Sequence, residues 1–270
     1  MRVARLVHKR PTVDTDKSLP IPWLFTGVEL EYNNFPWARK ADLPHAWEAV
    51  TEYSCGDNGG ELIFRDPLRG RAVVNALRDL HYSGLLSDVS VDMETSNHIH
   101  LDMLSLSLTQ LSNVVLMFFM LEGLLFKDAK RKLCPFCPQL RDRHNSILAV
   151  KHLMVRSPST ELLAALESVD KYTSVNFYSI IEKGSIEVRT FSSSANIMDI
   201  LNNIRLVQLI IKLALEFKYR IPCEHILDSI TLDRIALALR PLGVVEAMTP
   251  AELIDFKDEL TTRAFILESA

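Results

Sequence analysis

The sequence predicts an α+β protein in which helices pack on a largely antiparallel sheet. Segments with alternating apolar residues come in pairs, and segments with apolar residues at helical spacing separate these pairs. Strands and helices do not alternate regularly along the chain, which favours this fold class over a parallel sheet. The chain has no internal repeat, low-complexity tract or long linker, so we expect one domain over residues 1–270.

The first part of the chain contains two predicted strands and two predicted helices. An alternating pattern predicts a strand over 23–32, and 40–53 is expected to form a short helix. The Gly, Asn and Asp residues of 55–64 predict a turn that leads into a second strand. Residues 68–86 have apolar side chains at helical spacing and reach Gly84, a residue type that commonly ends helices.

The remainder of the chain adds paired strands and longer helices. Residues 89–104 alternate in polarity and predict a hairpin or paired strands, and 175–191 predict a hairpin around a Lys-Gly turn. Apolar periodicity predicts further helices over 105–128, 195–218, 228–240 and 249–266. We therefore expect a core over about 23–215 and a helical C-terminal extension over about 218–270.

Composition and charge are those of an ordinary globular protein. The chain is 48% hydrophobic and 24% charged, with a formal net charge of −4 and a pI near 6.1. This balance gives no clear signal for nucleic acid or an anionic membrane as a partner. The N-terminus lacks the continuous apolar segment of a secretory signal, and polar residues dilute the apolar run 104–126. We expect a cytoplasmic protein in which this run is a buried helix rather than a membrane span.

The four cysteines include one pair with the spacing of half a zinc site. Cys134 and Cys137 form the motif CPFC, and His144 or His152 could complete a set of ligands. The alternative is two reduced thiols in a turn stiffened by proline. We favour the turn and predict that the purified protein contains no stoichiometric zinc.

Polar residues of the types that bind ligands recur at positions i and i+2 of three predicted strands. Side chains two residues apart in a strand project from the same face, with their Cα atoms about 7 Å apart. A solvated sheet face also has alternating polar residues, but it is normally rich in Lys, Thr and Ser. Here the residues are carboxylates, imidazoles and one guanidinium. The pairs are Glu29 and Glu31, His98 and His100, and Glu187 and Arg189, and Glu61 lies early in a further strand.

Such a set of side chains indicates a site for a metal-bound polyphosphate. Clustered carboxylates repel one another unless cations neutralise them. Mg²⁺ or Mn²⁺, which prefer oxygen ligands, are suitable cations, and an imidazole can join such a site. An arginine on the same face can bind phosphate oxygens with its planar guanidinium.

Five motifs, in order and at their spacings, resemble the amidoligase family. They are FTGVELEY, DNGGELIF, SNHIHLDM, KYTSVNFYS and SIEVRTF, and the resemblance covers about residues 23 to 215. Amidoligases are carboxylate-amine ligases that share the catalytic fold of glutamine synthetase and glutamate-cysteine ligase. The resemblance therefore implies a glutamine-synthetase-like sheet that carries the active site, with ATP and Mg²⁺ (or Mn²⁺) as cofactors.

The resemblance also implies roles for individual residues. Arg189 would contact the transferring phosphate, and His100 would lie near the nucleotide phosphates or the substrate. The family often has an arginine and an asparagine after the long helix, which Arg143 and Asn145 match, while Arg141 competes with Arg143 for this position. Catalysis would involve Arg189, Glu187 and Glu61. The implied metal ligands are Glu29, Glu31, Glu61, His98 and Glu187.

The chemistry of carboxylate-amine ligation suits these residues. ATP phosphorylates the carboxylate, and the amine then displaces phosphate from the acyl phosphate to form an amide or peptide-like bond. Metal ions and an arginine stabilise the charge that develops on the γ-phosphoryl oxygens. The chain contains neither a G-x-x-x-x-G-K-[ST] loop nor a G-x-G-x-x-G motif, so ATP would be held by metals on the sheet. Neither the carboxylate nor the amine substrate is specified by these residues.

Two other classes of protein fit some of the same residues. His98 and His100, together with the carboxylates, could form a metal-dependent hydrolase in which a bound water attacks an amide or a phosphoester. The surplus of carboxylates favours a harder metal than zinc and so disfavours this reading. A non-catalytic protein that retains the fold is the third class, and the intact set of ligand-type residues argues against it.

Overall fold

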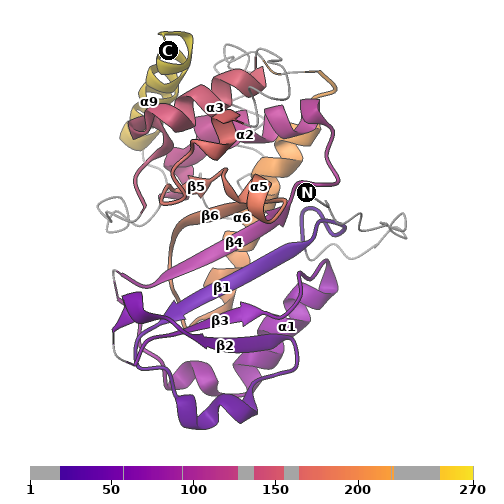
Figure 1. Cartoon of the computed structure of the whole chain (residues 1–270), viewed down its shortest axis with the longest axis vertical. Coiled ribbons are helices and arrows are strands. Elements are labelled where there is room, and N and C mark those ends of the chain that lie inside the picture. The colour runs from indigo at the N-terminus through magenta and orange to yellow at the C-terminus, as the bar shows by residue number, and fades with distance from the viewer. Residues whose placement is uncertain are drawn as a thin grey trace.

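The chain folds as an α+β protein around a six-stranded, antiparallel, open sheet. The computed structural model describes residues 19–56, 58–92, 94–126, 137–154, 164–219, 221 and 250–269. The strand order is β2-β3-β1-β4-β6-β5 (Figure 1). The strands are β1 (Thr26–Tyr32), β2 (Trp47–Thr51), β3 (Gly60–Phe64), β4 (Ser96–Asp102), β5 (Val175–Asn176) and β6 (Ser185–Ser192). The predicted fold class and the antiparallel sheet are thus confirmed.

The described helices include most of those that apolar periodicity predicts. The α-helices are α1 (Arg71–Tyr82), α2 (Leu108–Leu125), α3 (His144–Met154), α5 (Ser179–Glu182), α6 (Ile197–Leu215) and α9 (Pro250–Ser269). Short 3-10 helices are η1 (Trp37–Asp42), η2 (Tyr53–Cys55), η3 (Leu85–Ser87) and η5 (Leu140–Asp142). Helices α1, α2, α6 and α9 confirm the predictions for their segments, whereas the predicted helix over 228–240 lies outside the described residues.

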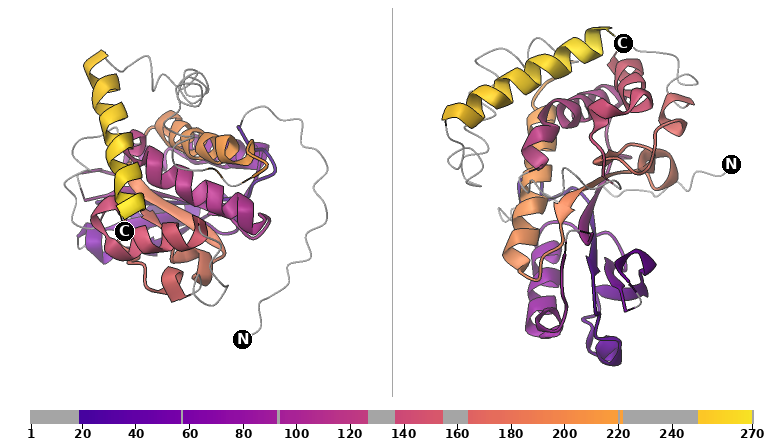
Figure 2. Two further views of the ribbon diagram at one scale, coloured as in Figure 1. Left: turned by 90° about the horizontal axis from the view of Figure 1, so that it is seen from above. Right: turned by 90° about the vertical axis from the view of Figure 1, so that its left-hand side faces the viewer.

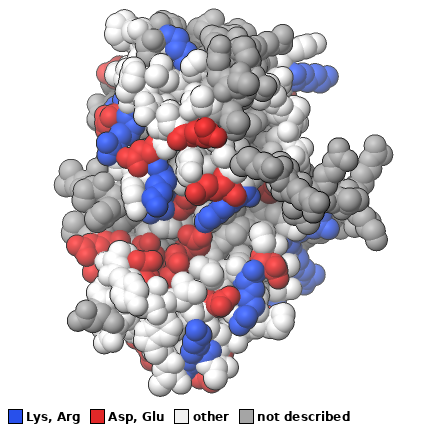
Figure 3. All heavy atoms as spheres, in the orientation of Figure 1, with Lys and Arg blue, Asp and Glu red and all other residues white. Residues whose placement is uncertain are grey.

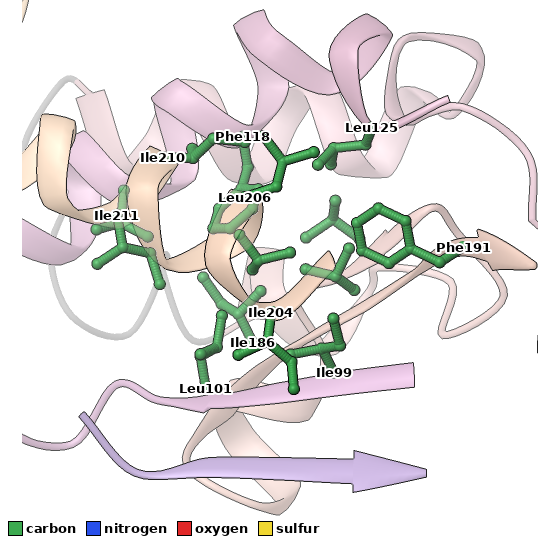
Figure 4. Close-up of a cluster of buried hydrophobic side chains, with 14 of the residues drawn as sticks. Ile99, Leu101, Phe118, Leu125, Ile186, Phe191, Ile204, Leu206, Ile210 and Ile211 are labelled. Atoms are coloured by element: carbon green, nitrogen blue, oxygen red, sulfur yellow. The ribbon is translucent and has the colours of Figure 1, made fainter. Parts of the chain in front are cut away.

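The alternation of residues along the strands gives the sheet an apolar face, which packs on helices. Ile99 and Leu101 of β4 and Ile186 of β6 are buried against α2 and α6, where Phe118 and Leu206 contribute to the same core (Figure 4). Helices α1 and α6 run along this side of the sheet (Figure 2). Burying one such side chain contributes about 1.5–3 kcal/mol, so the apolar face fixes which way every second residue points. The intervening polar residues consequently project from the opposite face.

The predicted helix over 40–53 is wrong for most of its length. Within it only the end of η1 (Trp37–Asp42) and the first residue of η2 (Tyr53–Cys55) are helical, and Trp47–Thr51 forms the edge strand β2. Trp47 and Ala49 are buried while Glu48 and Val50 are more exposed, which is the period of a strand. The indole nitrogen of Trp47 donates a hydrogen bond of 2.9 Å to the carbonyl oxygen of Ala76 in α1. This long-range contact overrides the local helical pattern.

The two predicted hairpins are only partly correct. Strands β5 and β6 of 175–191 pair antiparallel, but helix α5 lies between them in place of a tight turn. Gly184 follows α5 with a φ of 72°, a conformation that favours glycine. In 89–104, β4 is the strand that forms, and Ser90 makes an isolated bridge with Asn33. Strand β4 pairs instead with β1 and β6, which are distant in sequence.

Helix α2 is long and apolar enough to cross a membrane, with a mean hydropathy of 1.6. Most of its side chains are buried, and it packs against α3, α6 and α9. This packing is the arrangement that we predict from the polar residues at the start of 104–126. The apolar side chains of α2 thus form part of the core of the described structure.

A buried ion pair attaches the C-terminal helix α9 to α2. Nη1 of Arg263 lies 2.6 Å from Oε2 of Glu122, and both side chains are fully buried. The same Nη1 donates to the carbonyl oxygen of Phe119 at 2.9 Å. The other carboxylate oxygen of Glu122 accepts hydrogen bonds from the Leu140 backbone at 2.8 Å and from the Ser174 hydroxyl. Part of the predicted C-terminal extension is therefore built into the core.

Candidate functional site

The pairing of four adjacent strands brings the predicted ligand-type residues together on one face of the sheet. Strand β1 places Glu29 opposite His98 of β4 and Glu31 opposite Glu61 of β3. Strand β6 places Glu187 opposite His100. In Figure 1 the sheet lies in front of α6, and Figure 3 shows acidic side chains gathering across this side of the molecule. We call the following seven residues the central cluster: Glu29, Glu31, Glu61, His98, His100, Glu187 and Arg189.

Glu29 is the centre of the cluster. One of its oxygens, Oε1, lies 2.9 Å from Nε2 of His100, and the other, Oε2, lies 3.2 Å from Nδ1 of His98. Lys183 approaches Oε1 to 3.5 Å from the more exposed side. Burial acts to raise the pKa of Glu29, but the two imidazoles outweigh burial and hold the pKa well below its usual range. Glu29 is therefore an ionised carboxylate at neutral pH.

Gly27 makes room for the imidazole of His100. The two residues are paired across β1 and β4, and a Cβ atom at position 27 would lie 3.2 Å from the Cβ of His100. A larger residue would therefore press on His100 and displace it from Glu29. This glycine precedes Glu29 by two positions, so it belongs to the same face of the strand.

Glu31 and Glu61 differ in how well the protein compensates their charge. The backbone nitrogen of Ser96 donates to Oε2 of Glu31 at 2.8 Å, and the Ser96 hydroxyl donates to the same oxygen. Oε1 of Glu31 lies 3.6 Å from Nε2 of His98. No Lys, Arg or His forms an ion pair with Glu61 in the described part of the chain. Burial, followed by the charges of Glu29 and Glu31, raises the pKa of Glu61 to about 8.

Glu187 and Arg189 form the edge of the cluster nearest β5. Nη1 of Arg189 lies 2.6 Å from Oε1 of Glu187, and Nδ2 of Asn176 donates to Oε2 of Glu187 at 2.7 Å. The Arg189 guanidinium lies 5.8 Å from the ring centroid of Tyr172. Burial acts to raise the pKa of Glu187, but His98, Arg189 and His100 outweigh it, and the pKa lies below its usual value. The arginine is thus oriented by a carboxylate that is itself held in place.

Two groups of residues in the cluster could hold metal ions. The ligand atoms of Glu29, Glu61 and His98 lie within 4.8 Å of one another, and so do those of Glu29, His100 and Glu187. Glu29 belongs to both groups. Carboxylates with one imidazole fit Mg²⁺ or Mn²⁺ better than they fit softer metals. The uncompensated charge of Glu61 is the feature that a cation would neutralise.

Two predicted nucleotide-binding residues lie outside the cluster. Arg143 and Asn145 are exposed, and Nδ2 of Asn145 donates to the Ser168 carbonyl oxygen at 2.8 Å. Neither residue forms a hydrogen bond or ion pair with the central cluster in the described structure. Nη1 of Arg141, the competing residue, lies 3.7 Å from Glu259 of α9. The assignment of these residues to ATP therefore stays a prediction that the geometry of the cluster does not support.

The predicted CPFC turn is described only at its last residue. Cys137 is a buried free cysteine, and its thiol donates to the carbonyl oxygen of Arg189 at 3.4 Å. Cys134 lies outside the described residues, so the choice between a turn and half a zinc site stays a prediction.

Three residues that support the central cluster were not predicted from the sequence. Ser96 bonds Glu31 and also lies 2.6 Å from Nε2 of His98, Asn176 bonds Glu187, and Lys183 approaches Glu29. Ser96 precedes His98 by two residues, so the same alternation that identifies His98 and His100 could have identified it. Asn176 and Lys183 have no comparable signal, because their positions depend on how β5 and α5 pack beside β6.

The raised pKa of Glu61 predicts how stability depends on pH in the metal-free protein. The folded state binds this proton more tightly than the unfolded chain, whose carboxyl has a pKa near 4.5. Stability is therefore expected to fall as pH rises from about 5 to 8, by at most about 1.4 kcal/mol per pH unit from this group. In Glu61→Gln the free energy of unfolding, measured with denaturant in the presence of a chelator, should fall less steeply with pH. An unchanged slope in this variant would contradict the assignment, and exposed Glu167→Gln is the control.

No protein-family model and no curated protein sequence matches this chain. The functional argument below therefore starts from the geometry of the central cluster.

Proposed function

We propose that the chain is an ATP- and Mg²⁺-dependent carboxylate-amine ligase with a glutamine-synthetase-like active-site sheet. The observation that carries this proposal is the sharing of Glu29 between two groups of potential metal ligands, beside an arginine held by Glu187. A site that can hold two cations and an oriented guanidinium suits the phosphate chain of a nucleotide. The resemblance of five ordered motifs to amidoligases supports the same function and the finer assignment of the fold.

The reaction can be written with the groups that this sheet offers. An oxygen of the substrate carboxylate attacks the γ-phosphorus of ATP, the bond to the bridging β–γ oxygen breaks, and ADP leaves. The amine nitrogen then attacks the carbonyl carbon of the acyl phosphate, the carbon–oxygen bond to phosphate breaks, and the nitrogen loses a proton. Bound Mg²⁺ would supply charge neutralisation at the phosphates. No covalent intermediate with the protein is required.

Individual residues of the cluster would contribute to these steps in different ways. Glu29, Glu61 and Glu187, with His98 and His100, belong to the two groups and would hold the metal ions, whereas the predicted ligand Glu31 belongs to neither group. Arg189 would donate hydrogen bonds to the γ-phosphoryl oxygens as their charge changes. Glu187 would orient Arg189 through the contact of 2.6 Å, and Asn176 would orient Glu187 from the other side. Preorganised donors of this kind stabilise a transition state because they need not reorient during the reaction.

Binding of Mg²⁺-ATP tests the proposal directly. The ligase should show a higher melting temperature with ATP and Mg²⁺ together than with either alone. A metal-dependent hydrolase should respond to the metal without nucleotide, and a non-catalytic protein to neither. Glu29→Gln should abolish the stabilisation by Mg²⁺-ATP because Glu29 belongs to both groups of ligands, whereas the exposed control Glu167→Gln should retain it. Normal Mg²⁺-ATP binding by Glu29→Gln would refute the metal site.

Product formation tests the reaction class. The protein is incubated with ATP, Mg²⁺ and pooled carboxylates and amines, and products are sought by mass spectrometry. A ligase forms a compound lighter by one water than the sum of one carboxylate and one amine, together with ADP and phosphate. Release of ADP without such a compound, from pools that span amino acids, peptides and alkyl amines, would argue against ligation.

A further inference from the structure

A cleft of about 560 Å³ opens beside the central cluster, in the size range of small-molecule sites. Glu29 and His100 line the end of the cleft that meets the cluster, and we call this the inner end. Its walls are largely apolar. The apolar side chains that line the cleft are Phe25, Val28, Ile63, Phe64, Pro67 and Leu104.

Two carboxylates line the opposite end of the same cleft. The backbone nitrogen of Asp102 donates to the carbonyl oxygen of Phe25 at 3.0 Å, so Asp102 lies level with the start of β1. Phe25 precedes Glu29 by four residues, which corresponds to about 13 Å along a strand, and Asp102 follows His100 by two residues on β4, about 7 Å. Asp66 follows β3 in the segment before Leu68, whose backbone pairs with Thr26. We call the end of the cleft at Asp66 and Asp102 the outer end.

The charges of the two ends are compensated to different degrees. Lys183 also lines the cleft, but it approaches Glu29 at the inner end. Neither Asp66 nor Asp102 forms an ion pair with a cationic side chain in the described ranges. Arg69, a nearby cation, packs over the ring of Phe25 at 5.1 Å. The outer end therefore attracts a positive group and disfavours phosphate.

The inner end offers a buried nitrogen. Nε2 of His100 is buried and, although it is close to Glu29, has no hydrogen-bond partner in suitable geometry. A buried polar atom outside hydrogen-bond geometry is one to which a ligand in the cleft can bond. The cleft thus has a polar inner end, apolar walls and an anionic outer end.

We infer that this cleft binds the amine substrate and that this substrate is an alkyl diamine or polyamine. One nitrogen, uncharged when it reacts, faces the central cluster. The alkyl chain lies along the apolar walls, and a second nitrogen, as an ammonium, is held by Asp66 and Asp102. The role as substrate rests on the proposed ligase function, whereas the binding itself requires neither ATP nor metal. A nucleotide base with its phosphates fits the cleft less well, because Asp66 and Asp102 repel phosphate.

Calorimetry with matched amines tests this inference. Diaminohexane and hexylamine have the same chain and differ by the second nitrogen. The diamine should bind up to about fivefold more tightly, the size expected when a partly exposed carboxylate attracts a cation. Across diamines from diaminobutane to diaminodecane, affinity should pass through a maximum at an intermediate length, because the two ends of the cleft are a fixed distance apart. Equal affinity for hexylamine and diaminohexane would overturn the inference.

Variants of the outer end locate the binding. In Asp66→Asn/Asp102→Asn the preference for the diamine over hexylamine should disappear. Asparagine keeps the side-chain oxygen with which Asp102 accepts a hydrogen bond from the Leu104 backbone at 3.1 Å. Asp79→Asn, an exposed carboxylate of α1, is the matched control and should retain the preference. Persistence of the preference in the double variant, or displacement of the diamine by ATP without metal, would show that the cleft holds something else.

The ligase proposal and the cleft inference can fail separately. If diamines bind with the expected preference but no ATP-dependent product forms, the ligase proposal fails and the cleft assignment stands. If a product forms equally well from monoamines and diamines, the ligase proposal stands and the cleft inference fails.

Discussion

Arg189→Lys is expected to lower turnover by about 10²–10³-fold, with a much smaller change in apparent ATP affinity. In the proposed reaction the guanidinium contacts the γ-phosphoryl oxygens most strongly in the transition state, so its loss affects the rate more than binding. Lysine keeps the charge but not the planar pair of donors, one of which is fixed here by Glu187 at 2.6 Å. Steady-state kinetics with varied ATP separates the two effects.

A purely structural role for Arg189 predicts a different result. The guanidinium would then contribute only its ion pair with Glu187, whose side chain is buried. Lysine would preserve most of that, so turnover would be near normal and the melting temperature slightly lower. Arg78→Lys, on the exposed surface of α1, is the control for the substitution itself. Full activity of Arg189→Lys would refute the phosphoryl-transfer role even if Glu29 still bound metal.

The face on which the cluster lies could be predicted from local sequence. Residues at i and i+2 of a strand share a face whatever the rest of the chain does, so His98 and His100 had to project together. Which strands lie side by side is not local information. The contact between Glu29 and His98 depends on β1 pairing with β4, across more than sixty residues of sequence. The resemblance of five ordered motifs to amidoligases suggested that these strands lie together, whereas periodicity alone did not.

The errors in the predicted elements have a common cause. Residues 47–51 contain too few positions to distinguish a strand period from a helical one, and the hydrogen bond from Trp47 to Ala76 decides the outcome. Arg143 and Asn145 were selected by sequence order after a long helix, and their role stays a prediction; η5 and α3 leave both side chains exposed. Short segments and loop-adjacent residues are set by long-range packing, which a single sequence does not display.

The structural role of Glu122 is evident only from the fold. In the sequence it interrupts an apolar run, and in the structure it links three parts of the chain. It pairs with Arg263 of α9, and its other oxygen bonds Leu140 and Ser174. The carbonyl oxygen of Ser174 in turn accepts the backbone N–H of Arg189 at 2.8 Å. The ion pair thus supports the part of the sheet that carries Arg189.

Arg263→Met is expected to destabilise the protein by about 3–5 kcal/mol near pH 8, because it leaves a buried carboxylate without its cation. Burial already raises the pKa of Glu122, and Arg263 opposes that effect. Removing Arg263 raises the pKa of Glu122 in the folded state further. Above about pH 5 the carboxyl of Glu122 then ionises more readily in the unfolded chain, so the variant should lose stability as pH rises. The defect should therefore be smaller at pH 5 than at pH 8.

Adding Glu122→Gln to Arg263→Met separates the unpaired charge from lost packing. Glutamine still accepts the hydrogen bond from the Leu140 backbone but carries no charge, so the double variant should recover much of the stability at pH 8 and lose the added pH dependence. Denaturant unfolding of both variants at pH 5 and pH 8 measures the cost of the unpaired charge and the cost of the lost packing. If Arg263→Met were as stable as the parent at pH 8, the contact of 2.6 Å would contribute nothing, and α9 would be held to α2 by its apolar side chains alone.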